Sequence, residues 1–232
     1  MALTFADLPL RKETIAALAE HGFTSPFPIQ EQVMPIALAD GDVIGQAKTG
    51  TGKTLAFGIP VIERVIAPND ADWKDLANQG DPQVLIVVPT RELCVQVTKD
   101  IEELSFNRGI RTLAVYGGRA FEPQIEALQK GVEIVVGTPG RLLDLYRQGQ
   151  LTLKNVSRVV LDEADEMVSI LKDSLDEIVA EAPMSNGQID ISDTPEGKKG
   201  GFGIFTGSWL GGKNGLLKGI NDWMKEGEDF HE

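Results

Sequence analysis

The sequence has few of the residue types that build disulfide frameworks and metal clusters. Among its 232 residues are one cysteine, Cys94, and two histidines, His21 and His231. A single cysteine excludes an internal disulfide framework and a cysteine-cluster metal site, and two histidines exclude a histidine-rich site. We therefore expect a protein of a reducing compartment, of which the cytoplasm is the simplest.

Long apolar runs are absent too. No stretch of about 18 apolar residues occurs, so we expect no membrane-spanning helix. The first residues, MALTFADLPLRKET, lack the basic start and apolar run of a secretory signal. Apolar residues still make up 42% of the chain, which is enough for one α/β domain with a hydrophobic core, or for such a domain with a short appendage.

Positive charge is scarce as well. The chain has 22 Lys and Arg against 35 Asp and Glu, which gives a net charge of −13. Nucleic-acid-binding proteins usually present a basic face to phosphates, so this charge argues mildly against such a role. It does not exclude one, because a local basic cleft can lie on an acidic body.

Short runs rich in Val, Ile and Leu alternate with helical stretches between residues 40 and 165. Such runs are typical of strands buried on both faces, and the alternation indicates a parallel sheet covered by helices. The expected strands are Asp42–Gly45, Val84–Val88, Thr112–Tyr116, Glu133–Val136 and Arg158–Leu161. The expected helices are Lys53–Ile66, Arg91–Ser105, Phe121–Gln129 and Gly140–Gln148. Ligands of such sheets bind at the carboxyl ends of the strands.

The segment AKTGTGKT (47–54) follows one expected strand and begins a helix. Its glycines let backbone N–H groups turn inward and hold phosphate oxygens, and the positive end of the helix adds to the attraction. Lys53 can reach the β- and γ-phosphates, and the Thr54 hydroxyl can bind Mg²⁺. Ala47 replaces the usual first glycine, but the context favours a nucleotide-binding loop over a simple Gly-rich turn.

Two acidic residues end another expected strand, in VVLDEAD (159–165). Asp162 is placed to hold Mg²⁺, directly or through water, and Glu163 to orient or deprotonate an attacking water. The structural alternative is an acidic cap after a strand, and the phosphate loop upstream makes that alternative the weaker one.

Together these motifs resemble the DEAD-box ATP-dependent RNA helicases, specifically their first RecA-like domain, a P-loop NTPase fold. AKTGTGKT and DEAD correspond to the family's Walker A and Walker B elements, and GFTSPFPIQ (22–30) to its adenine-reading motif. The resemblance implies that Gln30 pairs with adenine, Phe23 stacks on the base and Phe5 is the motif's upstream aromatic. The nucleotide-binding residues it implies, with ATP and Mg²⁺ as cofactors, are Phe23, Gln30, Thr49, Gly50, Thr51, Gly52, Lys53 and Thr54.

Three further motifs resemble the family's RNA-contacting motifs: PTREL (89–93), the double glycine (117–118) and TPGR (138–141). The resemblance implies that threonine hydroxyls, glycine N–H groups and a helix N-terminus grip sugar and phosphate without reading bases. The RNA-binding residues it implies are Pro89, Thr90, Arg91, Gly117, Gly118, Thr138, Pro139, Gly140 and Arg141.

The resemblance covers residues 5–168 strongly and weakens beyond them. The family continues with a Ser-Ala-Thr motif that couples ATP hydrolysis to unwinding, and the sequence contains no SAT. Ser192 and Thr194 follow Asp165 at about the family's spacing, after an expected helix at 174–183. They could form a degenerate coupling motif with Asp165, or belong to an unrelated polar loop. Asp190 favours the loop, because a charge in a buried strand is costly.

Glycine becomes frequent near the end, with 11 among the 49 residues from Met184 to Glu232. We expect a loop or irregular ribbon over 197–215 and a short amphipathic helix over 215–226 that docks on the domain. The predicted division is a RecA-like DEAD-box ATP-binding domain at 1–196 and a Gly-rich tail at 197–232.

The family's second RecA-like domain, which supplies arginine fingers, has no counterpart in the sequence, and no arginine follows Arg158. Losing such an arginine costs a factor of ~10³ to 10⁵ in turnover. We therefore expect weak ATPase activity and no strand separation from the isolated chain. Glu163 would act as the base if a second RecA-like domain docked in trans.

Two other interpretations stay open. The chain could be a non-enzymatic interaction protein that keeps the fold and uses its tail to bind a partner or to block the face where a second domain would close. Alternatively, the tail could be foreign or artificial, joined by a fusion or a frame change near Met184.

Overall fold

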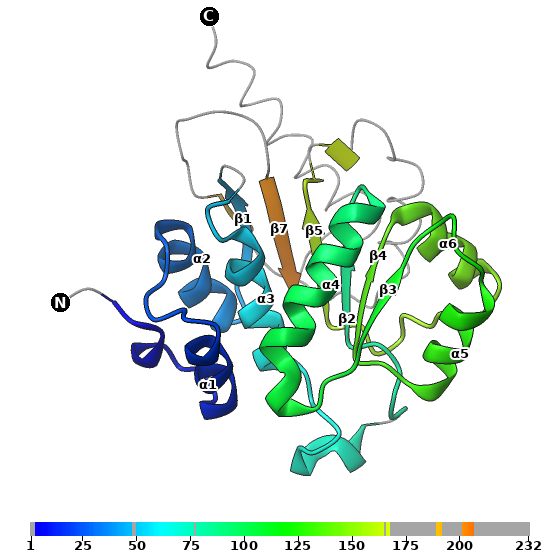
Figure 1. The fold of residues 1–232 in the computed structure, drawn as a ribbon, viewed down its shortest axis with the longest axis horizontal. Coiled ribbons are helices and arrows are strands. Elements are labelled where there is room, and N and C mark those ends of the chain that lie inside the picture. Colours follow the sequence, from blue (N-terminus) through cyan, green and yellow to red (C-terminus); the bar gives the residue numbers. More distant parts are fainter. Residues whose placement is uncertain are drawn as a thin grey trace, which may run out of the picture.

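The computed structural model describes residues 3–47, 50–76, 78–164, 166–167, 189–191 and 201–206. Its centre is one seven-stranded sheet with the strand order β3-β4-β2-β5-β7-β1-β6. Helices pack around this sheet (Figure 1). None of the described helices is both long and apolar enough to cross a membrane. The strands are β1 (Asp42–Gln46), β2 (Val84–Val87), β3 (Thr112–Val115), β4 (Ile134–Gly137), β5 (Arg158–Asp162), β6 (Ile189–Ile191) and β7 (Gly201–Thr206).

The expected elements are confirmed. The five strands and the four helices predicted between residues 40 and 165 are all present, and each boundary lies within two residues of its predicted place. The helices are α1 (Lys12–Glu20), α2 (Pro28–Leu38), α3 (Lys53–Arg64), α4 (Arg91–Ser105), α5 (Glu122–Lys130) and α6 (Pro139–Arg147). The described ranges also contain the short 3-10 turns η1 (Phe5–Asp7), η2 (Ala71–Asp75) and η3 (Phe106–Arg108). The mostly parallel sheet flanked by helices is therefore as the pattern predicts.

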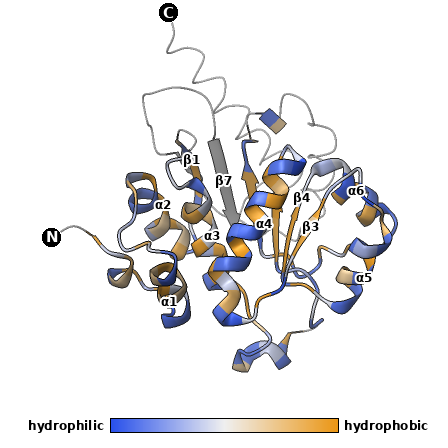
Figure 2. Ribbon diagram, viewed as in Figure 1, coloured by the Kyte–Doolittle hydropathy of each residue, from blue (hydrophilic) through white to orange (hydrophobic). Residues whose placement is uncertain are grey.

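The sheet is apolar on both faces because each face supports its own core. In β2, Val84 and Ile86 join a core with residues of α1 to α4, whereas Leu85 and Val87 join a second core with residues of α6 and β5. Successive strand residues point to opposite faces, so a continuous apolar run serves both cores. Figure 2 shows the apolar strands between helices whose outer sides are hydrophilic.

Two helices precede the first strand, and the spacing of apolar residues had not predicted them. Phe5 and Leu18 are buried in the same core as Met34 of α2, so this N-terminal segment is part of the domain. Pro28 occupies the first turn of α2, where its fixed φ suits a helix start. The segment positions Gln30, on that first turn, near the start of α3.

The C-terminal part of the sheet differs from expectation. Residues 201–206 were expected to be a loop or irregular ribbon, and that was wrong, because they form β7, antiparallel to both β5 and β1. Glycine is a poor strand former, but the facing edges of β1 and β5 present backbone N–H and C=O groups that a strand between them can pair. The domain boundary expected at 196 stays a prediction, although the sheet includes β7.

Several expectations fall on segments outside the described residues. These are the coupling residues Asp165, Ser192 and Thr194, the helix expected at 174–183 and the helix expected at 215–226. Asp190 favoured a loop before Ser192, but Ile189–Ile191 form β6, which pairs parallel with β1 at the outer edge of the sheet.

The single cysteine should be chemically silent in the folded chain. Cys94 of α4 is buried, and burial raises the pKa of its thiol to about 11. This folded-state pKa lies above the ordinary thiol pKa of 9.0. The thiol's contribution to stability is therefore complete below pH 9.0 and is lost as pH rises toward 11. We expect negligible reaction with a disulfide reagent at about pH 8, full reaction in denaturant, and a smaller alkaline loss of stability in Cys94→Ala.

Candidate nucleotide and nucleic-acid site

The phosphate loop joins β1 to α3 at the carboxyl edge of the sheet. Gly50 and Gly52 have φ of +83° and +86°, in the left-handed region where only glycine is unstrained. Gly52 caps α3, and Lys53 is the first helical residue. The loop therefore points the positive end of α3 at the place where a phosphate would lie. Thr51 is half-buried in the same loop, and Thr49 lies outside the described residues.

The acidic motif lies across from this loop. Asp162 is the last residue of β5, is buried, and accepts a hydrogen bond from the Glu163 N–H at 3.1 Å. The Glu163 Oε1 atom forms an ion pair with the Lys53 Nζ atom at 2.7 Å. β7 sets the spacing of the two parent strands, since Phe202 pairs with Asp162 and the adjacent Gly201 pairs with Gln46. The three predicted catalytic residues thus meet at one place.

The residues present fit a magnesium ion. Thr54, in the first turn of α3, and Asp162 offer a hydroxyl and a carboxylate oxygen, the donor types that Mg²⁺ prefers. No group of three or more His, Cys, Asp or Glu side chains that could hold a metal occurs among the described residues. Mg²⁺ usually binds through one or two carboxylates plus substrate phosphates, so a smaller protein donor set suffices.

Gln30 connects the N-terminal helices to the phosphate loop. Its side chain is 1% exposed; Oε1 accepts a hydrogen bond from the Phe27 N–H at 2.8 Å, and Nε2 donates one to the Gly52 carbonyl at 2.9 Å. A Cβ on Gly52 would overlap the Gln30 amide. The amide that the resemblance assigns to adenine therefore also holds the phosphate loop in place.

Three phenylalanines of the predicted adenine motif and its neighbourhood differ in their exposure to solvent. Phe23, the predicted stacking residue, is 37% exposed. Phe27, which the sequence reasoning did not single out, is 51% exposed and lies against Gly52. Phe5 is buried in the core, and its N–H donates to the Thr24 carbonyl at 3.3 Å. The Phe5 backbone therefore holds the 22–30 segment, whereas the Phe23 and Phe27 side chains are exposed enough to meet a base.

The predicted RNA-binding residues lie in three neighbouring loops at the same sheet edge. β2, β3 and β4 are parallel and aligned, because Val87 and Val115 both pair with Gly137. The loop after β2 carries Pro89 and Thr90, the loop after β3 carries the double glycine (117–118), and Thr138 follows β4. Thr90 caps α4 by accepting a hydrogen bond from the Leu93 N–H at 3.2 Å, and Thr138 is the N-cap residue of α6. Two helix N-termini and a glycine turn thus converge.

The arginines of these motifs have different surroundings. Arg91 is exposed, and its guanidinium occupies the space where a Cβ on Gly118 would lie. Arg141 is 8% exposed, whereas its neighbour Gly140 is exposed on the first turn of α6. Arg119 directly follows the double glycine and is exposed, and the sequence reasoning did not select it. Its position after Gly118 was the one signal that could have found it.

Comparison with known proteins shows what this arrangement is similar to. The DEAD/DEAH box helicase family model matches residues 27–198. The chain is 45% identical over 167 residues to a DEAD-box ATP-dependent RNA helicase CshA of Geobacillus kaustophilus, covering 72% of this chain and 34% of that protein. It is 39% identical over 193 residues to the protein of the same name from Streptococcus pneumoniae serotype 4, covering 83% of this chain and 35% of that protein.

A solved structure agrees with the sequence comparisons. The crystal structure of a DEAD box protein from the hyperthermophile Methanococcus jannaschii matches with a TM-score of 0.71 and 34% identity, over 97% of this chain and 54% of that one. The chain spans about a third of the length of the curated relatives named above. With its phosphate loop, acidic motif and aligned sheet-edge loops in place, this chain belongs to the DEAD/DEAH box helicase family.

Proposed function

We propose that this chain binds ATP with Mg²⁺ and the sugar–phosphate backbone of RNA, as the nucleotide-binding domain of an ATP-dependent RNA helicase. The observation that carries the proposal is the 2.7 Å contact between Lys53 and Glu163, which brings the phosphate loop and the acidic motif together. The loops of the RNA motifs follow strands of the same sheet, at the same carboxyl edge.

The nucleotide half of the proposal assigns a role to each side chain. Backbone N–H groups of the loop and the Lys53 ammonium hold the phosphates, and Thr54 and Asp162 hold Mg²⁺, which would neutralise phosphate charge when bound. Glu163 orients the attacking water and accepts its proton. Lys53 must leave Glu163 to reach a phosphate, so nucleotide binding frees the carboxylate for that task.

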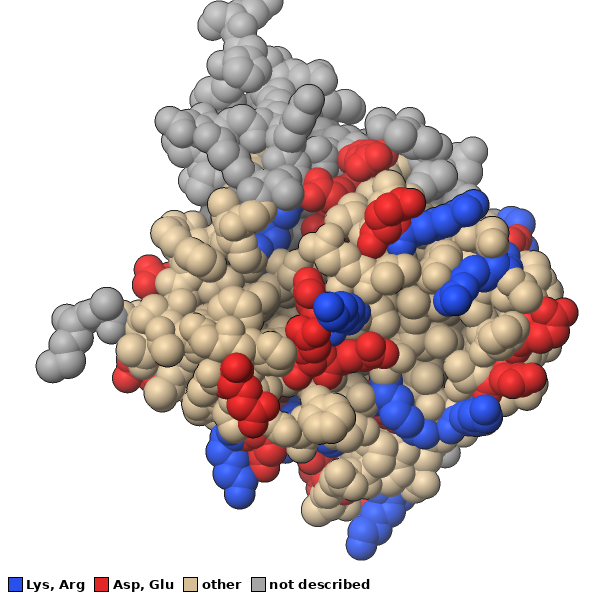
Figure 3. All heavy atoms as spheres, in the orientation of Figure 1, with Lys and Arg blue, Asp and Glu red and all other residues tan. Residues whose placement is uncertain are grey.

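The RNA half of the proposal depends on shape and local charge. The N-termini of α4 and α6 and the double glycine offer N–H donors, and the Thr90, Arg91 and Thr138 side chains lie beside them. None of these groups forms a base-reading surface, so we expect RNA binding without sequence preference. Figure 3 shows basic side chains gathered at the upper right of this face, although acidic residues dominate the chain.

A second RecA-like domain, acting in trans, belongs to the proposal as well. The described residues near Glu163 include one cation, Lys53, within ion-pair distance of that carboxylate. Stabilising a transferring phosphoryl group commonly requires an arginine in addition, worth a factor of ~10³ to 10⁵. We therefore expect the isolated 232-residue polypeptide to bind ATP and RNA, to hydrolyse ATP slowly, and not to separate strands.

The test is a titration of the wild-type polypeptide with a fluorescent ADP analogue and Mg²⁺, followed by a labelled single-stranded RNA. Saturable binding of both ligands supports the proposal. A folded circular-dichroism spectrum without nucleotide binding would overturn it and favour a non-enzymatic interaction protein. Catalytic, RNA-stimulated unwinding by the polypeptide alone would show that no second domain is needed.

Replacing Gln30 should affect both stability and base preference. Gln30→Ala leaves the Gly52 carbonyl and the Phe27 N–H without their partner, at a cost of about 1–3 kcal/mol in the free energy of unfolding. If the amide also reads adenine, the preference for ADP over GDP narrows in Gln30→Ala. Urea unfolding and parallel ADP and GDP titrations measure the two effects. A less stable variant with undiminished ADP preference would reduce Gln30 to a structural role.

A further inference from the structure

The loop between β3 and α5, from Tyr116 to Phe121, is held at both ends. The buried side chain of Gln124, in the first turn of α5, accepts a hydrogen bond from the Tyr116 N–H at 3.2 Å. The same amide donates to the Ala120 carbonyl at 3.0 Å. These two hydrogen bonds hold the loop on both sides of the double glycine.

The Arg141 side chain contacts this loop at Phe121 and at the Arg119 carbonyl. Its Cζ atom lies 3.8 Å from the centroid of the Phe121 ring, and its Nη2 atom donates to the Arg119 carbonyl at 3.0 Å. Its Nη1 atom is buried, with no hydrogen-bond partner in the described part of the chain. With 8% of its surface exposed, Arg141 is largely enclosed by the protein. The cation–π contact and the carbonyl offset part of the cost of burying the charge.

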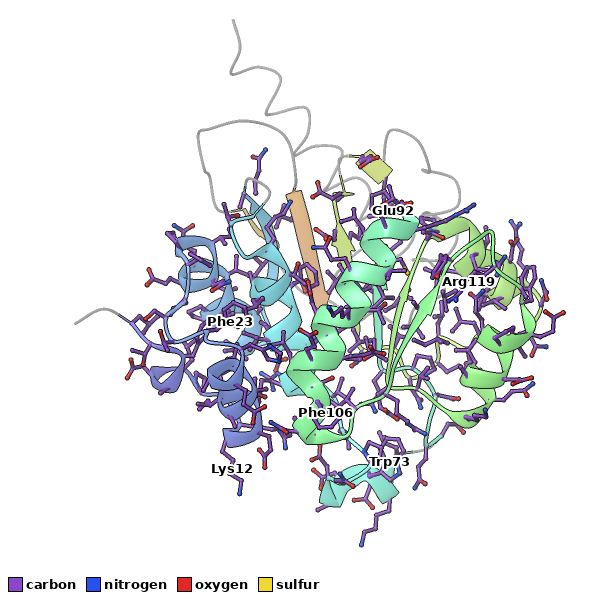
Figure 4. The ribbon with its side chains drawn as sticks, viewed as in Figure 1. Lys12, Phe23, Trp73, Glu92, Phe106 and Arg119 are labelled. Carbon is purple, nitrogen blue, oxygen red and sulfur yellow. The ribbon has the colours of Figure 1, made fainter. Side chains whose placement is uncertain are left out.

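Arg119 has different surroundings from Arg141. It is exposed, and its Cζ atom lies 5.6 Å from the centroid of the Tyr116 ring. Gly118 directly precedes Arg119, and the Arg91 guanidinium occupies the space where a Cβ on Gly118 would lie. One exposed arginine therefore lies against Gly118, and a second directly follows it. Figure 4 shows Arg119 on the same side of the molecule as Glu92, the second residue of α4, and away from Lys12.

We propose that Arg119 is a further RNA phosphate-binding residue beside Arg91, and that Arg141 is a positioning residue that holds the Arg119 loop and does not touch RNA. Exposed arginines at the double glycine suit the phosphates of a single strand, which planar N–H donors bind without reading bases. The Arg119 assignment rests on the proposed RNA binding, whereas the Arg141 assignment rests on the contacts of the free chain.

The first experiment measures binding of a labelled oligouridine by fluorescence anisotropy between about 50 and 200 mM salt. We expect Arg119→Ala to weaken binding about three- to tenfold at the low-salt end. We also expect the plot of log affinity against log salt to become shallower by about 0.7, the value for one lost phosphate contact on a single strand. Arg119→Lys should restore the slope, and Lys12→Ala, at an exposed lysine far from the loop, should change neither quantity.

The second experiment separates positioning from binding. Hydrogen exchange of residues 117–120, measured without RNA, should become faster in Arg141→Met and Arg141→Lys and stay unchanged in Arg119→Ala. Arg141→Lys keeps the charge but loses the planar stack on Phe121, so it also covers the case that Arg141→Met fails to fold.

Each outcome has one meaning. Wild-type chain that binds no RNA overturns the proposed function and the Arg119 role together. Wild-type chain that binds, with Arg119→Ala matching it in affinity and slope, overturns the Arg119 role alone. Unchanged exchange in both folded Arg141 variants overturns the positioning role, whatever the RNA does.

Discussion

We expect Lys53→Ala to abolish saturable binding of a fluorescent ADP analogue in the presence of Mg²⁺. Lys53 is the single lysine on the first turn of α3, is largely buried, and lies where the helix N-terminus meets the phosphate loop. Truncating one partner of a buried, hydrogen-bonded charge pair costs about 2–5 kcal/mol, which is a loss of affinity of at least about thirtyfold. A wild-type dissociation constant in the micromolar range would thus rise so far that an ordinary titration no longer reaches saturation.

Lys12→Ala is the matched control, because it removes an exposed lysine from α1 and leaves the phosphate loop untouched. Both variants must show the wild-type circular-dichroism spectrum, since Lys53→Ala also leaves Glu163 without its ion pair. Binding by Lys53→Ala within a few fold of the wild type would contradict the assignment of this loop to phosphate. Loss of binding in Lys12→Ala as well would point to a general defect instead.

A second large effect is expected from Glu163→Gln, which should separate binding from hydrolysis. The amide keeps the shape of the side chain but cannot accept the proton of an attacking water, and a general base contributes a factor of ~10² to 10⁴ to a rate. The same change removes the ion pair that holds Lys53 in the free chain. Nucleotide binding should therefore be unchanged or tighter while single-turnover hydrolysis of ATP falls by about 100-fold or more.

The backbone at this position sharpens the test. Glu163 has φ of +53°, in the left-handed region that costs a non-glycine residue on the order of 1–3 kcal/mol. Glutamine should accept this conformation as glutamate does. A fall in the rate of ATP hydrolysis would then reflect the loss of the general base and not a changed backbone conformation. Glu166→Gln, an exposed acid in the following turn, is the control and should hydrolyse ATP at the wild-type rate. Hydrolysis retained in Glu163→Gln would assign the base to another residue.

The strand–helix order was predictable because it depends on local pattern. Each buried strand is a run of β-branched and aliphatic residues, and each following helix has an apolar stripe, so neighbours in the sequence suffice to place both. The functional loops were predictable for the same reason, since a parallel sheet puts its strand-to-helix turns at one edge. Thr90 and Thr138 illustrate this, because both were selected from the sequence and both are N-cap residues of helices in the fold.

Three features could not be read from local pattern. β7 lies between β5 and β1 although its residues are far along the chain, and its glycines argued for a loop. Gln30 was assigned to a base, but its amide also holds the Gly52 carbonyl. Arg141 was assigned to RNA, which stays a prediction, and its guanidinium also stacks on Phe121. Each depends on a contact between segments that only folding brings together.

From the sequence alone came the family, the parallel sheet and the identity of the groups that can hold phosphate, because motif chemistry and apolar periodicity are properties of short segments. The folded chain decided which of those groups meet. Lys53 and Glu163 are 110 residues apart and become an ion pair only because aligned strands end at one edge of the sheet. It also decided which arginine faces solvent, since burial depends on what packs over a side chain, and no single segment carries that information.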